Sequence, residues 1–147
     1  MRSQLFDINI ENYHVLLTPQ EVKSKFPLTP SAEANVLKYR QELKDILDFR
    51  DRRKFIVIGP CSIHSTKLAL EYSQRLKKLQ EQVGDKLLLI MRVYFEKPRT
   101  TVGWKGLIND PDMDDSFHIE KGILTARELL LKINELGLPA GTEALDP

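Results

Sequence analysis

The sequence predicts an α/β fold in which two helices precede a parallel β-sheet. Short apolar segments at 55–58, 87–93 and 139–145 alternate with longer segments whose apolar residues recur at helical spacing. Strict alternation of strand and helix predicts parallel strands joined by right-handed crossovers. The expected order along the 147 residues is therefore two helices, then strand, helix, strand, helix and strand.

Two helix starts are predicted in the first fifty residues. Thr18-Pro19 and Thr29-Pro30 each combine an N-cap residue with a proline at the first helical position. The apolar residues after the second of these pairs lie roughly on one helical face. They predict a helix from about residue 30 to residue 49.

The first two strands are expected to be buried. The segments 55–58 and 87–93 are short, continuous and aliphatic, which is typical of strands buried on both faces of a parallel sheet. Gly59-Pro60 ends the first strand. Ser65 is positioned to cap the next helix, which we expect to end at Gly84.

A polar connection of unusual length follows the second strand. It extends from about residue 94 to residue 116, and long loops in compact domains tend to be functional. A third amphipathic helix is predicted over 117–136. Gly137 stops it and leads into the third strand.

The arrangement favours a (β/α) barrel. No G-x-G-x-x-G motif follows the first strand, which argues against a dinucleotide-binding, doubly wound sheet. Three parallel strands alone would leave two edges bare, and no helix follows the last strand to cover it. We therefore expect an incomplete part of a barrel, with residues 1–52 as a helical extension and residues 53–147 as the first βα units.

Composition excludes several classes of protein. The 22 Lys and Arg residues nearly balance the 21 Asp and Glu residues, so binding of nucleic acid or anionic membrane through bulk charge is not expected. No apolar run approaches the length of about 20 residues that spans a bilayer. Cys61 is the only cysteine, which rules out an intrachain disulfide. These features fit a reducing, cytoplasmic setting.

Polar side chains gather where the predicted strands end. Cys61 follows the first strand, Arg92 with Lys97 and Arg99 follows the second, and Glu143 lies near the end of the third. Ligands of α/β folds bind outside the carboxyl ends of the strands. The three cations would suit a small, multiply anionic substrate. The alternative is a solvated loop whose charges do nothing specific.

Individual candidates leave alternatives open. Cys61 is either a nucleophile or metal ligand beside a helix N-terminus, or an inert buried thiol. Arg92 favours a function because a cation in a buried strand needs a partner, which a bound anion can supply. Glu143 either faces the barrel mouth or pairs with a neighbouring cation.

Four motifs closely resemble the microbial class I 3-deoxy-D-arabino-heptulosonate 7-phosphate (DAHP) synthase family. They are IGPCSIH at 58–64, MRVYFEKPRTTVGWKG at 91–106, LINDP at 107–111 and GTEALDP at 141–147. The resemblance extends from about Val15 to the last residue. The motif at 91–106 is too long and too specific to arise by chance.

The resemblance implies a (β/α)₈ barrel, that is a TIM barrel, preceded by an N-terminal extension. It implies condensation of phosphoenolpyruvate with erythrose 4-phosphate to DAHP and phosphate, the first step of the shikimate pathway to aromatic amino acids. It also implies a divalent metal ion (Mn, Fe, Co or Zn), which would act as a Lewis acid on the aldehyde oxygen.

The family's functional residues map onto several positions of this chain. Cys61 corresponds to a metal ligand, and Arg92 and Lys97 to residues that bind phosphoenolpyruvate and line the reaction centre. Glu143 corresponds to a glutamate at the edge of the phosphoenolpyruvate site.

The KPRT motif corresponds to the contact with erythrose 4-phosphate, which assigns Lys97, Arg99 and Thr100 to that substrate. We expect Lys97 also to donate a proton to the developing alkoxide as a general acid.

Further expectations concern the whole protein. The family's other metal ligands lie beyond residue 147, so we expect the isolated chain to be inactive and poorly folded. Feedback inhibition by an aromatic amino acid is implied, and the ALDP ending at 144–147 favours tyrosine. A homo-oligomer, either a dimer or a tetramer, is expected. The alternatives are 3-deoxy-octulosonate 8-phosphate synthase and a non-catalytic anion-binding or regulatory fragment.

Overall fold

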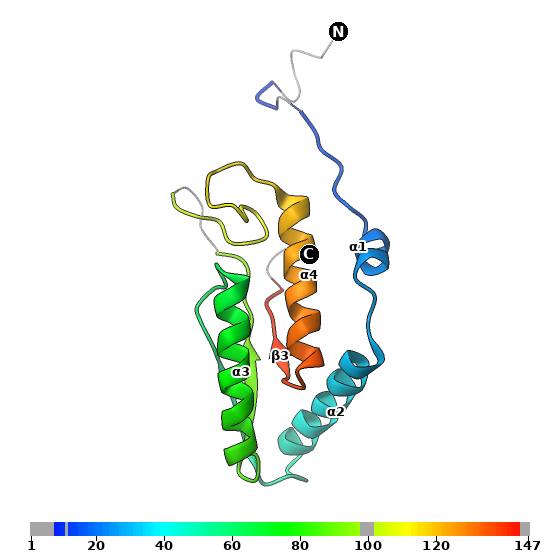
Figure 1. The fold of residues 1–147 in the computed structure, drawn as a ribbon, viewed down its shortest axis with the longest axis vertical. Coiled ribbons are helices and arrows are strands. Elements are labelled where there is room, and N and C mark those ends of the chain that lie inside the picture. The colour runs from blue at the N-terminus through cyan, green and yellow to red at the C-terminus, as the bar shows by residue number, and fades with distance from the viewer. Residues whose placement is uncertain (1–7, 11, 98–101, 145–147) are drawn as a thin grey trace.

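Helices and strands alternate as the sequence predicts. The computed structural model describes residues 8–10, 12–97 and 102–144. The elements in this part of the chain are α1 (Pro19–Lys25), α2 (Pro30–Leu47), β1 (Lys54–Ile58), α3 (Thr66–Val83), β2 (Leu87–Arg92), α4 (Ile119–Glu135) and β3 (Ala140–Gly141). Figure 1 shows α3 and α4 side by side, with α1 and α2 along the opposite edge of α4.

Local capping explains where the first helices begin. The Thr18 hydroxyl accepts the Glu21 N–H, while the Glu21 carboxylate accepts the Thr18 N–H at 2.7 Å, which completes a capping box. At α2 the Thr29 hydroxyl accepts the Ala32 N–H, and proline occupies the first turn of both helices. Both predicted helix starts are therefore confirmed.

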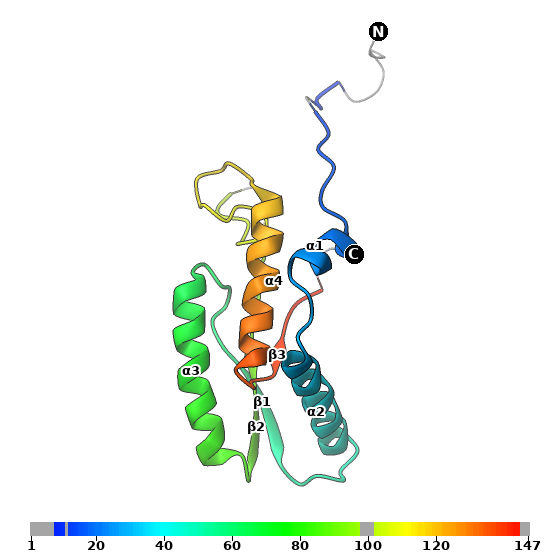
Figure 2. The same cartoon turned by 45° about the vertical axis from the view of Figure 1, so that its right-hand side comes forward.

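The three strands form one parallel sheet in the order β1-β2-β3. Lys54 of β1 pairs with Leu87 of β2, and Met91 of β2 pairs with Ala140 of β3. In Figure 2 the sheet lies between α3 on one side and α2 on the other. The predicted alternation of parallel strands and helices is confirmed.

The alternation of side chains along β2 separates two apolar clusters. Leu89 and Met91 point to the face that packs against α3 and α4, whereas Leu88 and Ile90 pack against Ile46 of α2. The larger cluster has twelve buried members: Ile63, Ala69, Leu76, Leu89, Met91, Val93, Phe95, Leu107, Ala126, Leu129, Ile133 and Leu138. Arg92 follows the same alternation as Leu88 and Ile90, which places it on the face away from α3.

The expectation that the first strand is buried on both faces is wrong for this chain. Phe55, Ile56, Val57 and Ile58 are 39–51% exposed, whereas the central residues of β2 are buried. The physical reason is position. β1 is an edge strand that pairs only with β2 in the sheet, and among the described residues no helix covers it as α3 and α4 cover β2.

The third strand is shorter than the predicted segment 139–145. Only Ala140 and Gly141 are extended and paired, and residues 145–147 lie outside the described part of the chain. β2 ends at Arg92, which pairs with Gly141. Beyond Gly141, β3 therefore has no further strand residue of β2 to pair with.

A side chain supports β2 where β3 does not reach. Gln80 of α3 is buried, and its amide donates to the Leu87 carbonyl oxygen at 3.1 Å and accepts the Leu89 N–H at 2.6 Å. These are the backbone groups on the β3 side of β2, because Met91 N–H donates to Pro139 in the same direction. Gln80 therefore replaces strand pairing along this half of β2.

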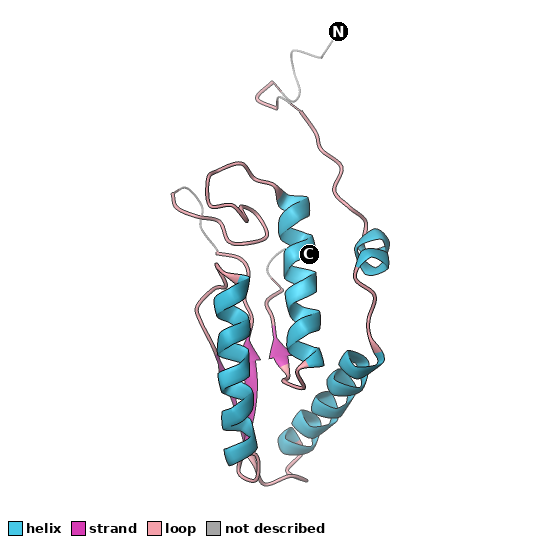
Figure 3. Cartoon of the chain, in the orientation of Figure 1, coloured by secondary structure: helices cyan, strands magenta, loops and turns pink. Residues whose placement is uncertain are grey.

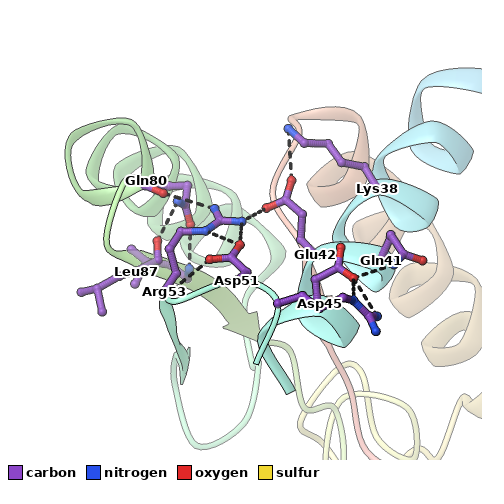
Figure 4. Close-up of polar contacts among 11 residues, drawn as sticks. Lys38, Gln41, Glu42, Asp45, Asp51, Arg53, Gln80 and Leu87 are labelled. Atoms are coloured by element: carbon purple, nitrogen blue, oxygen red, sulfur yellow. Dashed lines mark hydrogen bonds and ion pairs between the residues drawn. The ribbon is translucent and has the colours of Figure 1, made fainter. Parts of the chain in front are cut away.

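Arg53 links α2 to the amino-terminal end of the sheet through hydrogen bonds. Its guanidinium donates to Glu42 of α2 at 2.8 Å, to Asp51 at 2.8 Å and to the Gly84 carbonyl oxygen after α3 at 3.2 Å (Figure 4). These hydrogen bonds, to Asp51 first and then to Glu42, raise the pKa of Arg53 above its ordinary value. The residue therefore stays charged and ties three segments at the amino-terminal end of the sheet.

The long polar connection lies at the other end of the sheet. Figure 3 shows its described residues, 94–97 and 102–116, as loop near the amino-terminal ends of α3 and α4. In the described ranges no helix is long and apolar enough to cross a membrane.

Candidate active site

The candidate site lies where β1 and β2 end. Gly59 follows β1 directly and lies against Arg92, the last residue of β2. A Cβ atom at position 59 would meet the Arg92 carbonyl oxygen at 2.5 Å, which no side chain tolerates. Glycine here therefore allows the loop after β1 to approach the segment after β2.

Three predicted site residues meet in this region. Lys97 Nζ lies 3.1 Å from Cys61 Sγ, and Arg92 Nη2 donates to the Cys61 carbonyl oxygen at 3.2 Å. Cys61 is exposed, so the alternative is wrong in expecting its thiol to be buried. The Cys61 sulfur thus lies within hydrogen-bond distance of an ammonium group, and cysteine sulfur is a metal ligand and a nucleophile in other proteins.

Arg92 has an unused donor at the site. Its guanidinium stacks on the Tyr94 ring at 4.0 Å, which orients the planar fork. Within the described part of the chain, the Arg92 Nε–H is buried and has no hydrogen-bond partner. Leaving such a donor unpaired costs about 1–3 kcal/mol, so a bound oxyanion would be stabilised there.

The backbone that carries Lys97 is bonded to the loop that carries Cys61. The Ile63 N–H donates to the Tyr94 carbonyl oxygen at 2.7 Å. The buried Ser62 hydroxyl donates to the Glu96 carbonyl oxygen at 2.8 Å. These two bonds align the two segments, although their residues are more than thirty positions apart in the sequence.

Glu143 contacts the same segment from the loop that follows β3. Its Oε1 accepts the Phe95 N–H at 2.6 Å and the Glu96 N–H at 2.9 Å, and Oε2 accepts the Thr142 hydroxyl at 3.1 Å. Among the described residues Glu143 has no ion pair within 4.0 Å, so its observed partners are two backbone amides and a hydroxyl rather than a cation. The carboxylate thus supports the segment that leads into Lys97.

Two predicted site residues, Arg99 and Thr100, lie outside the described residues. The donors of a metal site are also incomplete. Within the described ranges no group of three or more His, Cys, Asp or Glu side chains could hold a metal ion. The Cys61 thiol is chemically suited to a borderline metal such as zinc, yet one thiol does not form a site.

Sequence reasoning did not single out Ser62 or Tyr94. The two-residue period of a strand could have placed Tyr94 on the same side as Arg92. No local signal marks Ser62, because its partner at Glu96 is distant in sequence.

Comparisons with known proteins show which family the chain resembles. The family model described as "DAHP synthetase I family" matches residues 25–147. The Tyr-sensitive phospho-2-dehydro-3-deoxyheptonate aldolase of Escherichia coli (strain K12) is 53% identical over 146 residues, which is 99% of this chain and 41% of that protein. The Phe-sensitive protein of the same strain is 52% identical, over 99% of this chain and 42% of that protein.

A solved structure extends the similarity to the fold. The phospho-2-dehydro-3-deoxyheptonate aldolase of Francisella tularensis SCHU S4 superposes with a TM-score of 0.90 at 46% sequence identity, covering 94% of this chain and 40% of that one. The chain thus spans about two fifths of the length of the proteins it matches. The predicted fold class, a helical extension followed by the first part of a (β/α)₈ barrel, is confirmed.

Proposed function

The chain belongs to the DAHP synthetase I family, and on that premise we propose that it carries part of the active site of a 3-deoxy-7-phosphoheptulonate synthase. The reaction condenses phosphoenolpyruvate with erythrose 4-phosphate and water. A carbon–carbon bond forms between the two substrates, water adds to C2 of phosphoenolpyruvate, and phosphate leaves from that carbon. The observation that carries the proposal is the convergence of Arg92 and Lys97 on Cys61, at the carboxyl ends of neighbouring strands.

Arg92 is proposed to bind phosphoenolpyruvate. Its free Nε–H is buried, and its guanidinium is held flat against Tyr94. A carboxylate or phosphate oxygen can accept from that donor, and the planar fork allows a second bond to the same anion. Binding therefore satisfies a group that the described residues leave unpaired.

Lys97 is proposed to act on the second substrate. Condensation forms a carbon–carbon bond between C3 of the enol and the aldehyde carbon, and negative charge develops on the aldehyde oxygen. An ammonium held at the site can donate a proton to that oxygen, and it also offsets the repulsion between two anionic substrates. Arg99 and Thr100 are proposed to complete the contact with erythrose 4-phosphate, and Glu143 to lie at the edge of the phosphoenolpyruvate site.

Metal dependence is part of the proposal. Cys61 would supply one ligand, and the remaining donors would come from outside the described residues. The roles of Arg92 and Lys97 follow from charge and position alone.

Regulation and assembly are proposed at the level of the whole protein. We propose residues 1–52 as an extension involved in regulation or oligomerisation, residues 53–147 as barrel, and an aromatic amino acid as effector. In support, curated relatives are named Tyr-, Phe- and Trp-sensitive. Identity of 53% and 52% to the Tyr- and Phe-sensitive E. coli proteins does not separate the two effectors. We propose tyrosine as the effector because of the ALDP motif at 144–147.

A coupled assay tests the proposed function. A full-length enzyme that carries this chain should form DAHP and phosphate from phosphoenolpyruvate with erythrose 4-phosphate, and should be slow with arabinose 5-phosphate. The reverse preference would favour the octulosonate synthase. Metal-independent, weak binding of phosphoenolpyruvate without turnover, measured by titration calorimetry with and without Mn²⁺, would favour an anion-binding fragment.

Lys97→Met tests the assigned acid. The substitution keeps length and removes the charge, so turnover should be abolished while the fold is retained. Retained turnover would remove Lys97 from the mechanism.

A further inference from the structure

We propose that Ser62 is a positioning residue, whose hydroxyl holds Lys97 against Cys61 during the reaction. The inference rests on the proposed function, because it assigns the orientation of the proposed acid to a residue that does not itself touch substrate. It concerns the hydrogen bond from Ser62 to the Glu96 carbonyl oxygen at 2.8 Å.

The position of that hydrogen bond lets it restrain the backbone of Lys97. Ser62 directly follows Cys61, and Glu96 directly precedes Lys97. The bond therefore joins the two backbones one residue away from each member of the 3.1 Å contact between Lys97 Nζ and Cys61 Sγ. A lysine side chain has four rotatable bonds, so its ammonium is placed only as well as its backbone is placed.

The hydroxyl is held in one orientation. Ser62 is 8% exposed, so water does not readily replace its acceptor. The neighbouring bond from the Ile63 N–H to the Tyr94 carbonyl oxygen aligns the same two segments but lies further from Lys97. Without the serine hydroxyl, the segment keeps that anchor, the bonds to Glu143 and the bond from the Lys97 N–H to the Lys105 carbonyl oxygen. The peptide before Lys97 loses its hydrogen bond to the loop that carries Cys61.

Ser62→Ala in a full-length enzyme that carries this chain is the test. We expect kcat for DAHP formation to fall about tenfold, because misplacement of a reacting group by about 1 Å can cost about a hundredfold and the remaining hydrogen bonds limit the displacement to less than that. The KM for phosphoenolpyruvate should change less than about threefold, since Arg92 hydrogen-bonds the Cys61 carbonyl oxygen and not the Ser62 hydroxyl.

Ser73→Ala is the matched control. Ser73 is also a buried serine whose hydroxyl donates to a carbonyl oxygen, that of Leu70 at 2.7 Å, but it lies within α3. We expect its kcat to match wild type. An equal fall in kcat for both variants would show a general packing effect and would overturn the proposal.

A second pair covers the case in which the alanine variant does not fold. Ser62→Thr and Ser62→Val both introduce a β-branched side chain of similar shape, and only threonine keeps the hydroxyl. Threonine should keep more of the wild-type kcat than valine, and equal values would overturn the proposal. If wild type makes no DAHP, the proposed function fails as well. If wild type is active and Ser62→Ala keeps its kcat within about twofold, only the role of Ser62 fails.

Discussion

Glu143 supports the segment before Lys97, and this support can be measured without substrate. Its Oε1 accepts the N–H groups of both Phe95 and Glu96. Glu143→Gln keeps a carbonyl oxygen at this place but removes the charge. Hydrogen bonds to a charged group contribute about 1.5–3 kcal/mol and neutral ones about 0.5–1.5 kcal/mol, so two bonds should lose about 2 kcal/mol together.

This loss should appear as faster hydrogen exchange. A decrease of about 2 kcal/mol in the free energy of local opening corresponds to exchange about thirtyfold faster. The increase should be confined to the Phe95 and Glu96 amides, measured by NMR or mass spectrometry in a full-length enzyme that carries this chain. Glu143→Ala leaves both donors unpaired and should raise exchange further.

Glu71→Gln is the matched control. Glu71 is exposed on α3 and its carboxylate pairs with Arg75, so exchange at Phe95 and Glu96 should not change. Unchanged exchange in both Glu143 variants, together with weaker phosphoenolpyruvate binding, would refute the reasoning. Glu143 would then act as a contact to substrate rather than as support for the loop.

Other predictions concern the fold, and the first two are measured in a full-length enzyme that carries this chain. Gln80→Leu should lower the free energy of unfolding in urea by about 2 kcal/mol, because two backbone groups of β2 lose their partners; the exposed Gln74→Leu should change it by less than about 0.5 kcal/mol, and equal effects would contradict the assigned role. Hydrogen bonds from His118 and then Lys121 hold the pKa of Asp112 below its usual value. Their stabilisation is therefore present above the unfolded pKa of about 4 and is lost as the pH falls through the lower folded pKa. Asp112→Asn should be less stable than wild type at pH 6 and equal to it near pH 2, and a difference that persists in acid would contradict this. The 147-residue chain alone, with the side chains of β1 39–51% exposed, should show neither a cooperative thermal transition nor DAHP formation, and observing both would refute that expectation.

Local signals predicted the elements well because their causes are local. Thr18 and Thr29 cap helices through residues three positions away, and Ser65 does the same for α3. Gly137 ends α4 with a φ of +79°, a conformation that favours glycine. Nothing beyond a few neighbours is needed for these predictions.

The burial of β1 and the length of β3 could not be predicted in this way. Apolar composition shows that a strand can be buried, but its neighbours decide whether it is. β1 pairs on one side only, and β2 ends before β3 can extend. Gln80 is a polar residue on an amphipathic helix. It can be buried because its amide hydrogen-bonds two backbone groups of β2 that pair with no strand in the described part of the chain.

The sequence by itself determined the order of elements, the helix boundaries and the family, because periodicity, capping residues and motifs are written in consecutive residues. It also named Cys61, Arg92 and Lys97 as candidates. Only the tertiary structure decided that Lys97 lies against Cys61, that Arg92 keeps a buried donor unpaired, and that Glu143 and Ser62 bind the backbone between them. The physical reason is that parallel strands bring their carboxyl ends together across dozens of residues, and hydrogen bonds at that distance leave no local pattern.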